Sequence, residues 1–187
     1  MAFLGGHRHC SSVMFCLLIA LLLACGVPAA SAQAVSEIEV KAAFLFNLTQ
    51  FVAWPVASLP RNQAPFVIGI LGEDPFGDVL DQTVQGEAVE GRKIVVERYT
   101  NLAAIKDCQI LFIGRSEERH LDQIWPLLKD KPVLTVADMP QFAKRGGTVN
   151  LITEHSKVRI AVNVSNAQAN QLIFSSNLLR VAEVIGR

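Results

Sequence analysis

Few side chains in this sequence have the types and the spacing that metal binding or nucleophilic catalysis requires. Beyond Ala32 the histidines are His120 and His155, and neither has a cysteine or a second histidine at ligand spacing. Cys108 precedes an apolar segment, which is a poor position for a nucleophile. No Gly-x-Ser-x-Gly element occurs. The sequence therefore predicts neither a metal site nor a catalytic residue.

Two acidic residues follow a predicted strand, at the end where α/β sheets usually bind ligands. Glu73 and Asp74 come directly after the apolar run 66–71 (FVIGIL). Because Pro75 follows, we expect Asp74 to cap a helix, with metal binding or phosphorylation as the alternative. The pair of glycines in 69–72 (GILG) lacks the third glycine of a dinucleotide-binding loop. We therefore predict no cofactor.

Gly146, Gly147 and Asn163 are polar or flexible positions in an apolar part of the chain. Glycines permit a left-handed turn, and an asparagine at a strand end is usually hydrogen-bonded. We interpret them as a tight turn and a satisfied amide, and a contact surface is the alternative.

The first 32 residues are predicted to be a secretory signal peptide. Arg8 precedes an apolar run at 13–27, and residues 30–32 (ASA) offer the small side chains of a cleavage site after Ala32. The apolar run is too short for a membrane anchor. Residues 22–25 (LLAC) leave an alternative, a lipoprotein signal in which Cys25 becomes the lipidated N-terminus.

Residues 33–187 are enough for one domain with a hydrophobic core. The chain has 17 basic and 17 acidic residues, so charge gives no reason to expect nucleic acid or an anionic membrane surface as a partner. The other cysteines lie in the predicted leader, so Cys108 cannot form an internal disulfide in the exported protein. We expect it to be buried, and pairing between two chains is the alternative.

One helix is expected to lie at the centre of the domain. Residues 37–55 are apolar on almost every side of a helical wheel, which predicts a helix covered on most sides and ended by Pro55. It is interpreted as a core helix, with a partner-binding helix as the alternative.

Short apolar runs then alternate with helical patterns, which predicts a parallel sheet with helices on both faces. The expected strands are 66–71, 93–99, 109–114 and 132–137. Residues 148–154 and 157–164 predict an antiparallel hairpin, and a last strand at 172–174 precedes a helix capped by Ser175 or Ser176. The predicted fold is α/β: a single three-layer domain with a mostly parallel central sheet flanked by helices and a C-terminal antiparallel hairpin.

Several motifs occur together in the order found in the YfiR family of exported bacterial proteins, which this sequence resembles over nearly all of residues 33–187. They are 40–47 (VKAAFLFN), 51–55 (FVAWP), 68–72 (IGILG), 108–113 (CQILFI), 133–136 (VLTV), 142–143 (FA) with 146–147 (GG), 160–163 (IAVN) and 174–180 (FSSNLLR).

The resemblance implies a periplasmic, dimeric and non-enzymatic regulator. Such proteins bind the periplasmic sensor domain of a membrane-bound diguanylate cyclase and repress it, and their release raises cyclic di-GMP and favours biofilm. The cysteine pairs of better-known members are missing here, so control by an internal disulfide is not implied. A small-ligand sensor module with its cleft near Glu73 and Asp74 is the alternative.

A repressor of this kind needs an exposed apolar surface for its partner. Leu172, Ile173 and Phe174 are apolar and follow a polar run at 166–171, and Trp54 lies at the exit of the first helix. These four residues are the predicted partner-binding residues, and the alternative is that they belong to the core.

Overall fold

The computed structural model describes residues 36–56, 59, 64–155 and 157–186. The predicted signal peptide, its cleavage site after Ala32 and the alternative lipidation site at Cys25 lie outside the described residues.

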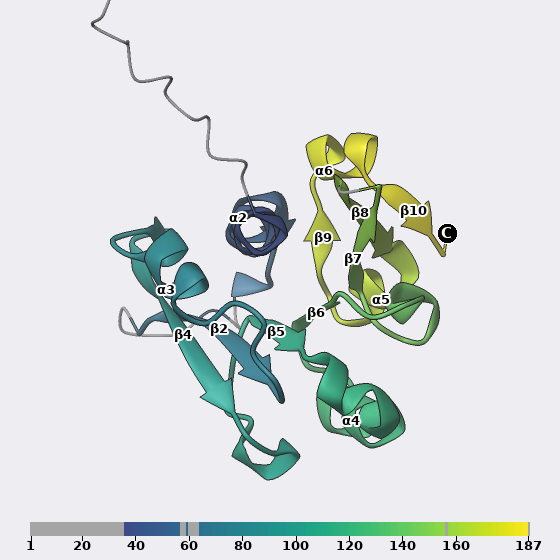
Figure 1. The fold of residues 1–187 in the computed structure, drawn as a ribbon, viewed down its shortest axis with the longest axis horizontal. Coiled ribbons are helices and arrows are strands. Elements are labelled where there is room, and N and C mark those ends of the chain that lie inside the picture. Colours follow the sequence, from purple (N-terminus) through teal and green to yellow (C-terminus); the bar gives the residue numbers. More distant parts are fainter. Residues whose placement is uncertain (1–35, 57–58, 60–63, 156, 187) are drawn as a thin grey trace, which may run out of the picture. The chain divides into compact units, whose positions relative to one another are not determined.

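The central sheet of the described residues contains eight strands (Figure 1). They are β2 (Phe66–Leu71), β3 (Ala88–Val89), β4 (Arg92–Tyr99), β5 (Ile110–Ile113), β6 (Leu134–Ala137), β7 (Val149–Glu154), β8 (Lys157–Asn163) and β10 (Glu183–Ile185). Their order is β10-β8-β7-β6-β5-β2-β4-β3. The neighbouring strands β7, β6, β5, β2 and β4 are parallel to one another. β7 and β8 form the predicted antiparallel hairpin, so the predicted fold class is confirmed.

Helices cover both faces of this sheet. The α-helices are α2 (Glu37–Phe51), α3 (Asp78–Val84), α4 (Leu121–Leu128), α5 (Val164–Ala169) and α6 (Ser176–Val181), and short 3₁₀ helices are η2 (Leu102–Ala104), η3 (Arg115–His120) and η4 (Phe142–Lys144). Phe66, Ile68 and Ile70 of β2 face the core layer that contains α2 and α3. Val67 and Leu71, which alternate with them, face the layer that contains α4.

The helix α2 is shorter and more exposed than the sequence predicts. Ser36 caps it in a reciprocal capping box with Glu39. It ends at Phe51 rather than beside Pro55, because the next two residues form the strand β1 (Val52–Ala53). Ile38 is 40% exposed, so the expectation of burial on most sides is wrong at the first turn.

The helix cap predicted at Asp74 is wrong, because its carboxylate makes other contacts. α3 begins at Asp78 after Gly77, and Asp74 instead accepts a hydrogen bond from the backbone N–H of Phe76. Ser116 lies inside η3, where its hydroxyl accepts from the backbone N–H of Glu73.

The C-terminal segment also departs from the prediction. The last predicted strand is β9 (Ile173–Phe174), which pairs with β1 in a separate antiparallel ribbon instead of joining the sheet. Ser175 does cap α6, accepting from the backbone N–H of Leu178. The helix ends at Val181, and Ile185 lies in β10, which pairs in parallel with β8.

Candidate functional site

The ribbon of β1 and β9 brings together the residues that the sequence singled out as partner-binding. Val52 pairs with Phe174, and Ala53 pairs with Ile173. The indole N–H of Trp54, one residue beyond β1, donates to the backbone carbonyl of Gln109 at 3.2 Å. Its ring meets Phe66 edge-on at 5.1 Å between centroids, so Trp54 anchors the ribbon to the core.

Burial separates Ile173 from the other three predicted residues. Trp54, Leu172 and Phe174 are at most 9% exposed, whereas Ile173 is 69% exposed. Because side chains alternate along a strand, the burial of Leu172 and Phe174 fixes Ile173 on the outer face. Trp54, Leu172 and Phe174 therefore belong to the core, and of the four residues Ile173 alone exposes its apolar side chain to solvent.

Ala53 is also exposed, and it lies directly across the ribbon from Ile173. Side chains at paired positions of an antiparallel ribbon point to the same face. Ala53 and Ile173 thus form a small apolar area, called here the Ile173 surface. Both chain neighbours of each residue are buried, so Ala53 and Ile173 keep their outward orientation without a partner.

The alternative cleft near Glu73 and Asp74 is filled by neighbouring loops. Strand order reverses between β2 and β5, which is where an α/β sheet usually opens a crevice. A Cβ on Gly72 would lie 2.8 Å from the Glu117 side chain, and one on Gly114 would meet the backbone of Glu73. The loops after the two strands therefore touch each other at this point.

The carboxylate of Asp74 is paired with an arginine. The Nε of Arg98 on β4 donates to its carboxylate at 2.7 Å, and the same guanidinium pairs with Asp81 of α3. The carboxylate thus ties the loop after β2 to β4 rather than facing open solvent. This arrangement does not favour the small-ligand reading of Glu73 and Asp74.

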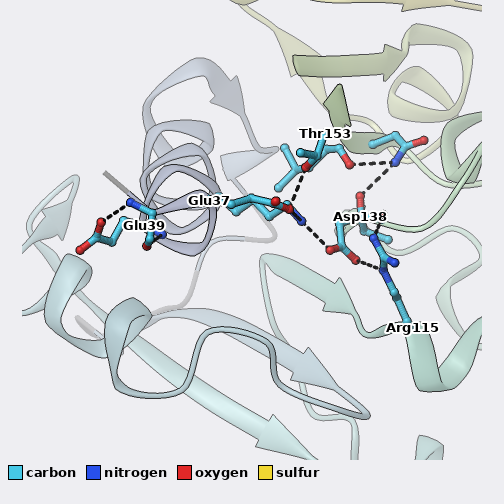
Figure 2. A network of polar contacts seen from close by, with 10 residues as sticks. Glu37, Glu39, Arg115, Asp138 and Thr153 are labelled. Carbon is cyan, nitrogen blue, oxygen red and sulfur yellow. Dashed lines mark hydrogen bonds and ion pairs between the residues drawn. The ribbon is translucent and has the colours of Figure 1, made fainter. Parts of the chain in front are cut away.

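A polar network lies at the carboxyl end of β6 (Figure 2). Lys41 of α2 donates to Asp138 at 2.7 Å and pairs with Glu37 at 2.6 Å. Arg115 pairs with the other oxygen of Asp138 at 3.2 Å, and the Thr153 hydroxyl donates to Glu37 at 2.8 Å. The network joins α2 to the ends of β5, β6 and β7.

Burial and pairing act in opposite directions on the two central groups of this network. The side chains of Lys41 and Asp138 are 6% and 9% exposed. Burial lowers the pKa of Lys41, but hydrogen bonds with Asp138 and Glu37 outweigh it and raise the pKa above its ordinary value. Burial raises the pKa of Asp138, and Lys41 and Arg115 outweigh it and lower that pKa. Both groups are therefore held in their charged forms.

Sequence reasoning missed this network. A lysine in a largely apolar helix is a signal that a buried charge needs a partner. The sequence does not reveal that Asp138, 97 residues away, is that partner.

Cys108 is buried, as predicted, and it forms no disulfide within the part of the chain that the structure describes. Burial, with the nearby carboxylates of Asp107 and Glu97, raises the pKa of its thiol to about 12. Such a thiol carries almost no thiolate at neutral pH, so it is a poor nucleophile.

Asn163 and Gly147 have structural roles. The Asn163 amide donates to the carbonyl of Ala143 at 2.8 Å, and its oxygen accepts from the N–H of Asn166 at the start of α5. A Cβ on Gly147 would lie 2.2 Å from the ring of Phe142, so only glycine fits there. The satisfied amide and the close packing agree with the structural interpretation of both positions.

The histidines are placed apart. His120 lies at the end of η3, with its Nδ1 3.0 Å from a carboxylate oxygen of Glu117, and His155 lies at the hairpin tip. Within the described part of the chain, no group of three or more histidine, cysteine or acidic side chains is arranged to hold a metal ion.

A model of the YfiR/HmsC-like family matches residues 38–183, which is most of the chain. The chain belongs to the YfiR/HmsC-like family. This match starts in α2 and ends at the first residue of β10, so it includes the other seven strands of the central sheet and the β1–β9 ribbon. No curated protein matches the chain.

Membership in this family indicates a periplasmic regulator of diguanylate cyclase signalling, from a family of regulators rather than catalysts. Among the described helices, none combines the length and the hydropathy that a membrane span requires.

Proposed function

We propose that this YfiR/HmsC-like protein is a non-enzymatic repressor that binds the periplasmic domain of a membrane-bound diguanylate cyclase through the Ile173 surface. Binding holds the cyclase inactive, and release of the repressor raises cyclic di-GMP in the cell. The proposal extends the regulatory role of the family to a specific partner and a specific surface.

The observation that carries the proposal is the exposure of Ile173 between two buried neighbours. An isoleucine that is 69% exposed leaves apolar area in water, and the fixed ribbon beneath it presents that area without further ordering. The balanced charge of the chain gives little electrostatic steering, so apolar contact is the main source of affinity available here.

The test is Ile173→Glu, expressed in a host that carries the cyclase. We expect the purified variant to melt like the wild type, because the side chain is exposed, and to bind the periplasmic domain of the cyclase at least about thirtyfold more weakly. Intracellular cyclic di-GMP should rise to the level of a deletion strain.

Leu127→Glu is the matched control. Leu127 is an exposed apolar residue of α4, on the sheet face opposite to the one that β9 covers. The Leu127→Glu variant should still repress the cyclase and leave cyclic di-GMP low. A stable Ile173→Glu protein that still represses the cyclase would show that another surface is used.

We also propose that the chain is exported as a soluble homodimer after cleavage behind Ala32. The small residues 30–32 and the short apolar run before them support the export, and the resemblance to the YfiR family supports the dimer. The intact mass of the protein from its native host should fit a first residue of Gln33, and light scattering should give twice the chain mass. A diacylated N-terminal Cys25 would instead establish the lipoprotein form.

A further inference from the structure

A groove lies between α4 and α5. Its volume is about 540 Å³, within the range of pockets that hold small organic ligands. Trp125, Pro126 and Leu128 of α4 form one side, and Thr135 of β6 lies at its base. Gly146 completes the wall: a Cβ there would lie only 3.0 Å from the indole of Trp125.

Polar groups without partners gather around this aromatic wall. Asp122, Lys129 and Asn170 line the groove, and none of their side chains has a hydrogen-bond or ion-pair partner among the residues that the structure describes. The indole N–H of Trp125 is likewise without an acceptor there. Together they offer a carboxylate acceptor, an ammonium donor, an indole donor and an amide that does both.

The chemistry of this lining selects among small ligands. The formal charges of Asp122 and Lys129 cancel, which disfavours a strongly anionic or cationic ligand. A groove that is partly open cannot cover a long alkyl chain, whose apolar surface would stay in water. A sugar ring has hydroxyls that both donate and accept, and an apolar face of C–H groups suited to the negative face of an indole.

We propose that this groove is a saccharide-binding site, in which Trp125 carries the C–H face of a neutral pyranose and the side chains of Asp122 and Asn170 bind its hydroxyls. Trp125 and Leu128 belong to the core layer on the sheet face opposite to Leu172 and Phe174. Neither Ile173 nor Ala53 lines the groove, so the proposal does not depend on the repressor proposal.

The experiment is saturation-transfer NMR on the protein with cellobiose, maltose and N,N′-diacetylchitobiose as probes, followed by titration of any binder. We expect at least one of these disaccharides to bind the wild type. In Asp122→Ala or Asn170→Ala the Kd should rise roughly tenfold, as for the loss of a hydrogen bond to a charged or buried group. Trp125→Ala should abolish the transfer.

Trp125 packs at 5.7 Å against Phe142, so its replacement could unfold the domain. Asp122 is exposed and Asn170 is partly exposed, so their variants keep the test valid. Gln123→Ala, an exposed neighbour on the same helix, is the control and should bind like the wild type. The proposal fails if no probe shows transfer, or if a binder keeps its affinity in both Asp122→Ala and Asn170→Ala.

Discussion

The ammonium of Lys41 lies 2.7 Å from the carboxylate of Asp138, across 97 residues of sequence and nearly out of contact with water. The contact joins the first helix of the domain to the carboxyl end of a central strand. Breaking a buried pair leaves one charge without compensation, whereas removing both charges does not.

We predict a strong energetic coupling between these two residues. Asp138→Asn alone and Lys41→Met alone should each lower the free energy of unfolding by about 3 kcal/mol, because each removes the buried partner of the other charge and leaves it only an exposed one, Glu37 or Arg115. The double variant should lose much less than the sum. Urea denaturation of the four proteins measures the coupling.

The exposed pair of Arg159 and Glu154 is the control for that cycle. Its atoms are 3.7 Å apart and its side chains are 71% and 51% exposed. Alanine at both positions should give a coupling below about 1 kcal/mol. Additive losses at Lys41 and Asp138 would contradict the view that they act as a pair.

A second prediction concerns pH. The folded pKa of Asp138 is lowered, so its stabilising contribution is complete above the unfolded value of about 4 and is lost as the pH falls from there through the folded pKa. The folded pKa of Lys41 is raised, so its contribution is complete below about 10.4 and is lost as the pH rises beyond that value.

The difference in Tm between the wild type and Asp138→Asn should therefore be constant from about pH 5 to pH 9 and should shrink below about pH 4. Thermal melts across this range, read by circular dichroism, test it. A difference that keeps its full size at about pH 2 would show that Asp138 acts through its shape and hydrogen bonds rather than its charge.

A third prediction concerns Cys108. Because the thiol is buried and its pKa is about 12, it should react with a maleimide or a disulfide reagent only slowly in the native state and quickly in denaturant. An exposed thiol introduced by Gln123→Cys should react quickly in both conditions. Fast native labelling of Cys108, or a dimer that a reducing agent separates, would overturn the prediction.

The central strands could be predicted because burial on both faces leaves a clear pattern. The run at β2 is apolar without a break, and β5 repeats it, so both are parallel interior strands by composition alone. The same reasoning fails for β1 and β10, which have two and three residues. Their extended form depends on a partner strand that lies far away in the sequence.

The candidate site was predicted only in part, for a related reason. The sequence predicts an apolar strand at 172–174, but it does not show which side of that strand faces the core. In the structure Ile173 turns outward while its neighbours turn inward. The groove left no sequence signal, because the fold alone brings Asn170 near Asp122 and Trp125 of α4.

The contacts of α2 also set the order in which the chain can fold. Glu37 meets Thr153 across 116 residues, and the strand that follows α2 pairs with β9 near the other end of the chain. Contacts this distant close large loops and form slowly. As the chain is synthesised, α2 can pack against α3 early, but β1 lacks its partner strand, and Glu37 lacks Thr153, until the last quarter of the chain has followed. The segment that starts the domain is therefore completed only by the segment that ends it, so the finished domain forms when the chain is almost complete.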